Sequence, residues 1–159
     1  MIQQAQLPMV QTSSMNDFHL QDMLSLNKIE SLAVRKDSKE LEEELLTYLD
    51  HTKEHFAHEE EMMIEKKFPP YLHHKEEHDK ALKNLENMIS EFQTSKNPVV
   101  VSDYLEKTLI PWFLQHVETL DSVTSMFLEN SEEHLKFWEN LDWEKRKAYT
   151  QSKKDSFTL

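Results

Sequence analysis

The chain has 159 residues, a formal net charge of -12, and neither glycine nor cysteine. Because tight hairpin turns depend on glycine and because Leu, Glu and Lys are strong helix formers, this composition favours an all-α protein of one domain. The lack of cysteine excludes disulfides, iron–sulfur clusters and thiolate catalysis. The acidic charge disfavours nucleic acid, no apolar run is long enough to span a membrane, and no secretion signal is evident, so a cytoplasmic protein is expected.

Hydrophobic residues recur at steps of three and four along most of the chain, which is the pattern of amphipathic helices. Residues 1–15 precede this pattern and are predicted to form a flexible N-terminal arm. Four helices joined by short loops predict an antiparallel up-down-up-down four-helix bundle over residues 16–128. The expected helices cover residues 16–35, 39–67, 71–94 and 99–128, with N-caps at Asn16 and Ser38.

Proline interrupts the last of these helices. Pro111 lacks an N–H and its ring clashes with the carbonyl of Lys107, so either the helix kinks there or a new helix begins at Pro111. After the bundle, Asn130 and Glu133 match a capping box, which predicts a short fifth helix and then a polar tail. Residues 129–159 are therefore expected to lie outside the bundle.

Two pairs of potential metal ligands have the spacing of one helical turn. His55-x-x-x-Glu59 lies in the second expected helix, and His74-x-x-x-His78 lies in the third. Residues i and i+4 lie on the same face of a helix, so each pair can bind one metal ion together. All four residues fall on stripes predicted to face the core, where a polar group without a partner would be costly.

The remaining candidates are His19 in the first expected helix and the pair His116 and Asp121 in the fourth. Five residues turn about 140° round an α-helix. We therefore expect His116 and Asp121 to flank a centre that lies beside their helix. Five imidazoles and two carboxylates are too many for one ion with an open position, so they predict two ions. With no sulfur donor, they suit iron, zinc, copper or manganese.

The ordered set of motifs resembles the bacterial hemerythrins, over about residues 16–128. The resemblance implies two iron ions with a bridging oxo or hydroxo group, and an open position for O2 on the iron that has fewer histidines. The segments that carry it are His55–Met63, Phe68-Pro69, His74–His78 and Trp112–Val117 with Asp121. The implied ligands are His74, His78 and His116 on one iron, His19 and His55 on the other, and Glu59 and Asp121 as bridges.

The resemblance implies reversible O2 binding, for storage, delivery or sensing, by a monomer or weak oligomer that is not an enzyme. The alternative is a di-iron enzyme or sensor that handles peroxide or nitric oxide. The sequence contains no Glu-x-x-His pair, which counts against the ferritin-like oxidases. It also lacks the motifs of metalloproteases, α/β-hydrolases and phosphate-binding loops.

Other residues of the same types are expected to have structural roles. The acidic run Glu59–Glu61 is read as a solvated face apart from Glu59. Trp112 is expected to belong to the core, and beside a metal it would also keep the pocket dry. The histidines expected to be solvated surface residues are His51, His58, His73 and His134.

Overall fold

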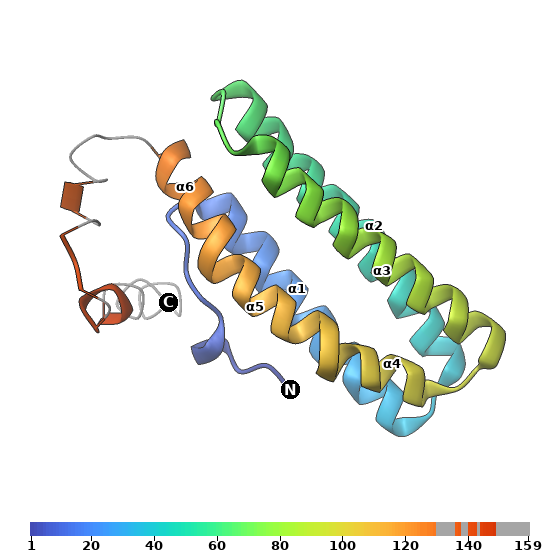
Figure 1. Ribbon diagram of the computed structural model, residues 1–159. Helices are drawn as coiled ribbons and strands as arrows, with labels where there is room; N and C mark the ends of the chain where they lie inside the picture. Colours follow the sequence, from blue (N-terminus) through green and yellow to red (C-terminus); the bar gives the residue numbers. More distant parts are fainter. Residues whose placement is uncertain (130–135, 138–139, 143, 149–159) are drawn as a thin grey trace.

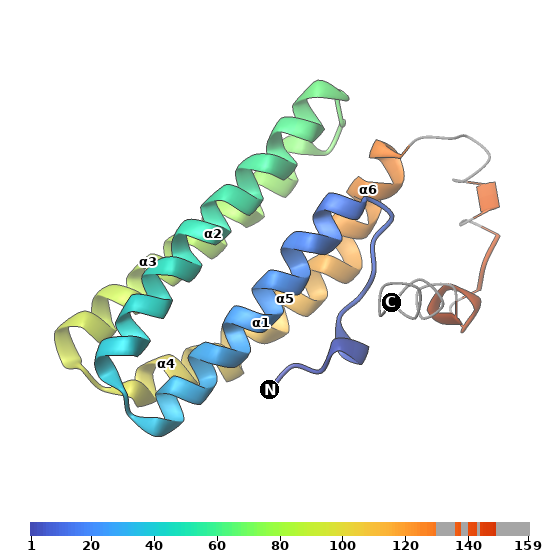
Figure 2. The same ribbon diagram turned by 180° about the vertical axis from the view of Figure 1, so that it is seen from behind.

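The structure is a computed structural model that describes residues 1–129, 136–137, 140–142 and 144–148. A short 3-10 helix, η1 (Gln4–Gln6), is followed by three long helices: α1 (Ser13–Arg35), α2 (Ser38–Glu65) and α3 (Tyr71–Ser95). A fourth rod runs from Pro98 to Leu128 and is assembled from shorter elements. Figures 1 and 2 show the four rods packed side by side, with successive rods running in opposite directions. The all-α up-down-up-down bundle predicted from the sequence is confirmed.

The fourth rod alternates between α-helix and π-helix. Two of its elements are single π-helical turns, in which the backbone bonds from residue i to i+5 instead of i+4. The rod continues through Pro111 in helical conformation, and a π turn ends two residues before it. The missing N–H therefore falls where the hydrogen-bond register changes. In order, the elements are α4 (Pro98–Tyr104), η2 (Leu105–Leu109), α5 (Ile110–His116), η3 (Val117–Asp121) and α6 (Ser122–Leu128).

The N-terminal segment differs from the flexible arm that was expected, because it packs on the bundle. Ile2, Leu7 and Val10 are buried and belong to the hydrophobic core. The first helix already begins at Ser13, and Asn16 does not cap it. Instead, the Asn16 amide accepts a hydrogen bond from the N–H of Val10 (2.9 Å) and donates one to its carbonyl (2.7 Å).

The loops between the rods are made without glycine. Lys36, Lys67 and Lys96 adopt the left-handed conformation (φ 59°, 54° and 51°) where α1, α2 and α3 end. This conformation ends helices commonly, and glycine usually supplies it. At the start of α2 the capping residue is Asp37 rather than Ser38, because the Asp37 carboxylate accepts a hydrogen bond from a backbone N–H of the first turn (3.2 Å).

The buried side chains divide the bundle along its length. Near the α1–α2 and α3–α4 loops the core is apolar, whereas farther along the rods buried polar and charged side chains meet. The apolar half gives the rods a fixed packing, which positions the polar half. The buried apolar residues of the first half include Leu26, Ile29, Leu32, Leu41, Leu45, Leu85, Ile89 and Phe92.

After the bundle, the described part of the chain is fragmentary. The predicted fifth helix starts at Asn130, outside the described residues. Of the part that is described, residues 136–137 are helical, whereas residues 140–142 are not. Residues 144–148 are also helical, whereas a polar tail was expected there. The Asp142 carboxylate accepts a hydrogen bond from the N–H of Lys145 (2.9 Å) at the start of this turn.

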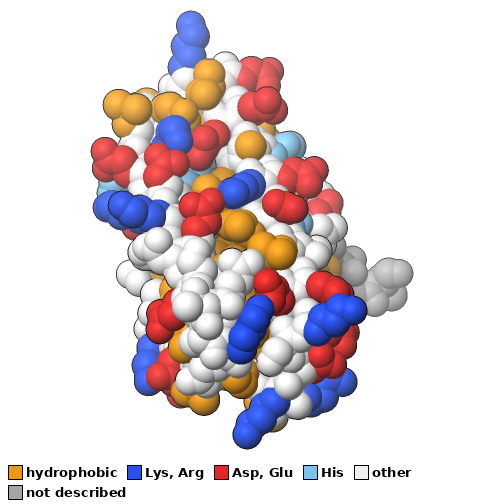
Figure 3. Space-filling view, turned by 90° about the vertical axis from the view of Figure 1, so that its right-hand side faces the viewer, with side chains coloured by type: hydrophobic (Ala, Val, Ile, Leu, Met, Phe, Trp, Pro, Cys, Tyr) orange, Lys and Arg blue, Asp and Glu red, His pale blue; other side chains and the backbone are white. Residues whose placement is uncertain are grey.

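The surface carries both signs of charge. Figure 3 shows acidic and basic side chains interspersed on one face, with apolar side chains exposed between them. No helix in the described part of the chain is both long and apolar enough to cross a membrane.

Candidate metal centre

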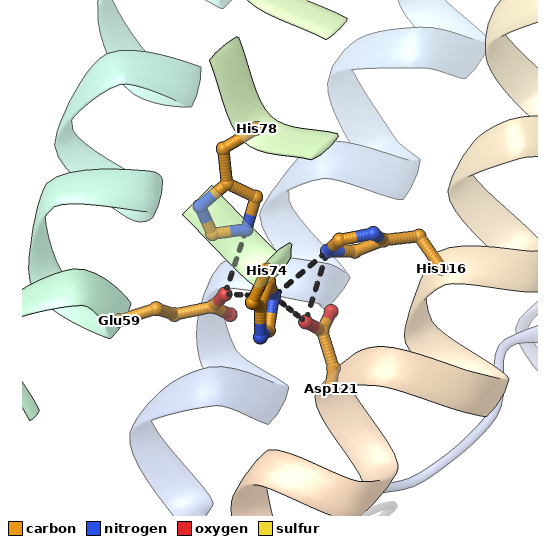
Figure 4. A group of neighbouring side chains, drawn as sticks. All are labelled: Glu59, His74, His78, His116 and Asp121. Carbon is orange, nitrogen blue, oxygen red and sulfur yellow. Dashed lines mark hydrogen bonds and ion pairs between the residues drawn. The ribbon is translucent and has the colours of Figure 1, made fainter. Parts of the chain in front are cut away.

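All seven ligands predicted from the sequence lie in the polar half of the bundle. Each is at least 95% buried, and all four rods contribute. Figure 4 shows that five of them point toward one another from three of these rods. By element, α1 provides His19, α2 provides His55 and Glu59, α3 provides His74 and His78, α5 provides His116, and η3 provides Asp121.

Three histidines and the two carboxylates form a first group. One ligand atom from each of Glu59, His74, His78, His116 and Asp121 lies within 4.8 Å of all the others. Asp121 Oδ1 is 3.0 Å from His74 Nε2 and 3.1 Å from His116 Nε2. Glu59 Oε2 is 3.3 Å from His78 Nε2. This set is called the three-histidine group below.

Two histidines form a second group on the other side of the same carboxylates. Ligand atoms of His19, His55 and Glu59 lie within 4.8 Å of one another. Glu59 Oε1 is 2.7 Å from His55 Nε2, and Asp121 Oδ2 is 3.0 Å from His19 Nε2. This set is called the two-histidine group.

The two carboxylates are shared between the groups. Glu59 turns Oε1 to the two-histidine group and Oε2 to the three-histidine group. Asp121 turns Oδ2 to the former and Oδ1 to the latter. A carboxylate that offers one oxygen to each of two adjacent positions has the arrangement of a bridging ligand. The geometry therefore provides for two metal ions side by side.

Several donor atoms of this cluster are buried without a hydrogen-bond partner. They include His19 Nε2, His78 Nε2, Glu59 Oε2 and both carboxylate oxygens of Asp121. Buried polar atoms are nearly always paired, so unpaired ones need an explanation. These atoms lie close together yet do not meet in hydrogen-bond geometry, because they converge on common points. Nitrogen and oxygen donors that converge in this way fit metal ions well.

A π turn brings His116 and Asp121 to the same centre. The sequence predicted that they would flank a centre beside an α-helix, and this expectation was wrong in its geometry. Between the two residues the backbone forms the π turn η3, in which five residues complete roughly one turn. Both side chains therefore point inward, with His116 Nε2 3.1 Å from Asp121 Oδ1.

Residues 18–128 match the family model described as the hemerythrin HHE cation binding domain. The chain belongs to the hemerythrin family. It is 33% identical over 117 residues to the bacteriohemerythrin of Aquifex aeolicus (strain VF5), an alignment that covers 72% of this chain and 87% of that protein. No solved structure matches the chain. Family membership and the buried donors together support the di-iron cofactor that the sequence predicted.

Electrostatics keeps the carboxylates of this hemerythrin centre anionic. Burial by itself raises the pKa of the Asp121 carboxyl, but the adjacent imidazoles of His116, His19 and His74 hold that pKa well below its usual range. The pKa of Glu59 is also low: burial and the charge of Asp121 raise it, and neighbouring imidazoles outweigh both. Two buried anions surrounded by imidazoles favour cations at this position.

Further contacts orient the ligand imidazoles from behind. In three of these imidazoles the Nδ1 atom lies within 3.2 Å of a side-chain oxygen, so that Nε2 faces the centre. Such contacts fix both the tautomer and the orientation of a metal-bound histidine. The pairs are His55 with Asp22 Oδ2 (2.8 Å), His74 with Thr124 Oγ1 (2.8 Å) and His78 with Glu60 Oε1 (3.2 Å).

The roles of these supporting residues were not predicted from the sequence. Asp22 is buried and lies three residues after His19, a spacing that places both on one side of α1 and could have indicated it. Glu60 was read as part of a solvated face, although it contacts His78. Of the histidines expected on the surface, His73 is exposed and His51 and His58 are half-buried. His134 lies outside the described residues.

Aromatic rings close the hemerythrin centre toward the outside. Phe56 stacks on His78, with ring centroids 3.9 Å apart, and Trp112 stacks on His116 at 4.5 Å. A small internal cavity of about 10 Å³ touches His55 and Asp121, and its wall includes Trp112 and His116. The same two residues line a groove of about 340 Å³ that opens to the surface. Trp112 therefore lies between the centre and solvent.

Proposed function

We propose that this protein binds O2 reversibly at a non-heme di-iron centre. The observation that carries the proposal is the pair of buried carboxylates, each of which offers one oxygen to either side of a histidine cluster. Membership of the hemerythrin family, and likeness to a protein named bacteriohemerythrin, support it. Bound as two ferrous ions, the cofactor supplies the electrons that O2 binding requires.

We assign the ligands according to the two groups. The three-histidine group has enough donors to saturate one iron, whereas the two-histidine group leaves a coordination position open for O2. Glu59 and Asp121 would each provide one oxygen to either iron. The rings of Phe56 and Trp112, which stack on His78 and His116, would shield the ions from solvent.

We further infer that the protein is a carrier, store or sensor rather than an enzyme. Oxidative loss of bound O2 consumes protons, and the aromatic wall limits the supply of water and protons to the centre. Rapid turnover of peroxide or nitric oxide would favour the enzyme alternative. A cytoplasmic location and a monomeric or weakly oligomeric state belong to this proposal, as does the absence of nucleic acid as a partner, which the charge of -12 supports.

Anaerobic purification tests the function directly. Iron per chain is measured, and the absorption spectrum is recorded before air, after air and after evacuation. We expect two irons per chain and a colour that appears with O2 and fades under vacuum. A protein that binds iron but never forms a reversible oxygenated state would contradict the proposal.

A matched pair of variants tests whether the ligands are the predicted ones. His73 and His74 are neighbours in α3, but the first is exposed and the second is buried in the three-histidine group. His74→Ala should lose iron and the oxygen-dependent colour, whereas His73→Ala should retain both. Equal iron contents in the two variants would refute the assignment of His74.

A further inference from the structure

A chain of contacts leads from the two-histidine group to the edge of the bundle. His55 turns Nε2 to Glu59 (2.7 Å) and Nδ1 to Asp22 Oδ2 (2.8 Å). The other oxygen of Asp22, Oδ1, lies 3.0 Å from His51 Nε2. The side chain of His51 is 16% exposed, so this series of contacts runs from the centre to solvent. None of the residues in the three-histidine group contacts Asp22 or His51 through an ion pair within the described part of the protein.

Asp22 is a buried charge whose only ion-pair partners among the described residues are these two imidazoles. Its side chain is 3% exposed, and none of the lysines and arginines that the structure describes forms an ion pair with it. An aspartic acid is ordinarily an anion at neutral pH, and the imidazole nitrogens of His55 and His51, 2.8 and 3.0 Å from its oxygens, favour that form. A buried anion is costly unless it is paired. Its full charge therefore acts on the two rings.

The ligands of the three-histidine group have weaker partners. The hydroxyl of Thr124, which contacts His74, carries no charge. Glu60, which contacts His78 at 3.2 Å, is 19% exposed and lies 3.8 Å from the ammonium of Lys75. Solvent and Lys75 reduce the effect of Glu60 on its histidine. Of these three contacts, only the one between Asp22 and His55 joins a ligand imidazole to a buried carboxylate.

Packing holds this chain of contacts in place. The ring of Phe18 stacks on His55, with centroids 5.0 Å apart and planes inclined by 8°. The same ring lies 5.5 Å from that of His51. Phe18 therefore fixes both imidazoles around Asp22, which limits their rotation away from the carboxylate.

We propose that Asp22 is a positioning residue that strengthens His55 as a ligand, so that exogenous anions bind more weakly at the open position, and that His51 holds Asp22 in place. A carboxylate behind a metal-bound imidazole increases the basicity of that imidazole. A more basic ligand makes the metal a weaker Lewis acid. This inference rests on the proposed function, because it assumes that the iron bound by His19 and His55 has the open position.

Azide titration of the oxidised, iron-loaded protein tests the role of Asp22. Asp22→Asn keeps the shape of the side chain and removes its charge, so azide should bind more tightly, on the order of tenfold. Glu60→Gln makes the same chemical change behind His78, on the iron without the open position, and should leave azide affinity close to that of the wild type. Iron per chain and the thermal unfolding curve are recorded for each variant as structural controls.

The role of His51 is tested by His51→Leu. The same variant tests the proposal if Asp22→Asn does not fold. This substitution removes the ion-pair contact between His51 and Oδ1 of Asp22, so the carboxylate is less well held beside His55. Azide affinity should increase in the same direction as in Asp22→Asn, but by a smaller factor. His51→Gln, which retains an N–H donor, should lie closer to the wild type.

The outcomes separate this inference from the proposed function. If the wild type binds two irons and azide, and Asp22→Asn and His51→Leu bind azide as the wild type does, the inference is overturned and the function stands. An equal increase in Asp22→Asn and Glu60→Gln would also overturn it, because the effect would then not depend on the open position. A wild type that binds no iron would overturn the proposed function itself.

Discussion

His116 and Asp121 contact one another across a π turn, with Nε2 and Oδ1 3.1 Å apart, although they lie five positions apart in the sequence. On a regular α-helix this separation would turn one of the two side chains away from the bundle interior. The π turn adds one residue to the turn and restores the common direction. A backbone irregularity is thus what allows one rod to direct both His116 and Asp121 into the same buried cluster.

Lengthening this turn should break the centre. Insertion of one alanine after Glu118, which is exposed within η3, would add a step between His116 and Asp121 and rotate one of the two side chains by about 100°. We expect iron to fall from two per chain to one or fewer. Deletion of Glu118 leaves a spacing of four, at which a regular α turn places both side chains on one face, so it should retain more iron than the insertion. The substitution Glu118→Ala, which keeps the length, should retain two irons. Equal iron contents in the insertion variant and the wild type would show that the length of the turn does not position the two side chains.

The bundle and its ligands could be predicted because both depend on helical periodicity. Spacings of four residues placed His55 with Glu59 and His74 with His78 on inward faces, and the structure has them there. The π turn could not be predicted in this way, since helical periodicity implies a constant rotation per residue between His116 and Asp121. The five-residue spacing of two inward ligands was itself the signal for a π turn.

The contacts between rods could not be predicted from helical periodicity. Asp22 meets His55, and Glu60 meets His78, only because α1 packs on α2 and α2 on α3 in particular registers. The N-terminal segment has no helical stripe, so the burial of Ile2 could not be predicted from spacing. Its buried residues pack on the bundle with an irregular backbone whose polar groups need partners such as Asn16.

Asn16 should stabilise the protein by fastening the N-terminal segment. Its side chain makes two hydrogen bonds to the backbone of Val10, and both are buried. Asn16→Ala would leave the N–H and carbonyl of Val10 without these partners, at a cost of about 1–3 kcal/mol. Chemical denaturation should show this loss, whereas Asn16→Asp should lose less, because its carboxylate still accepts from the N–H. Unchanged stability of Asn16→Ala would mean that water replaces the amide fully.

Removal of the metal should destabilise the fold. The donors of the centre include several unpaired buried atoms, which metal ions would satisfy. A ligand present at 100 times its dissociation constant stabilises the folded state by about 2.7 kcal/mol. For a chain of this length that corresponds to a rise in Tm of about 5–10 °C. Thermal unfolding with and without a chelator measures the difference, and equal transitions would argue against metal binding by the folded protein.

Metal-free protein should become less stable between pH 6.5 and 8. Burial lowers the pKa of His19, but contacts with Asp121 and Glu59 raise it more, from 6.5 to about 8. Because the folded state binds this proton more tightly than the unfolded state does, His19 contributes about 2 kcal/mol below pH 6.5, and this contribution disappears as the pH rises through 8.

Metal ions compete with the same proton, so their affinity should rise over this pH interval. Urea unfolding of the metal-free protein at several pH values, and Zn²⁺ competition as a redox-inert probe, measure the two opposite trends. His19→Gln should show a shallower pH dependence in both experiments. Stability that increases from pH 6.5 to 8 in the metal-free wild type would contradict the predicted contribution of His19.

Trp112 should slow the irreversible oxidation of the oxygenated protein. Its ring stacks on His116 at 4.5 Å and lies between the internal cavity and the surface groove. Trp112→Ala would open this wall to water, and protons carried by water promote the loss of bound O2 in reduced form. We expect the colour of the oxygenated state to decay at least several-fold faster, while iron content stays at two per chain. Trp112→Phe keeps an apolar ring over His116 and should decay at an intermediate rate; if Trp112→Ala decays as slowly as the wild type, the indole does not exclude water from the centre.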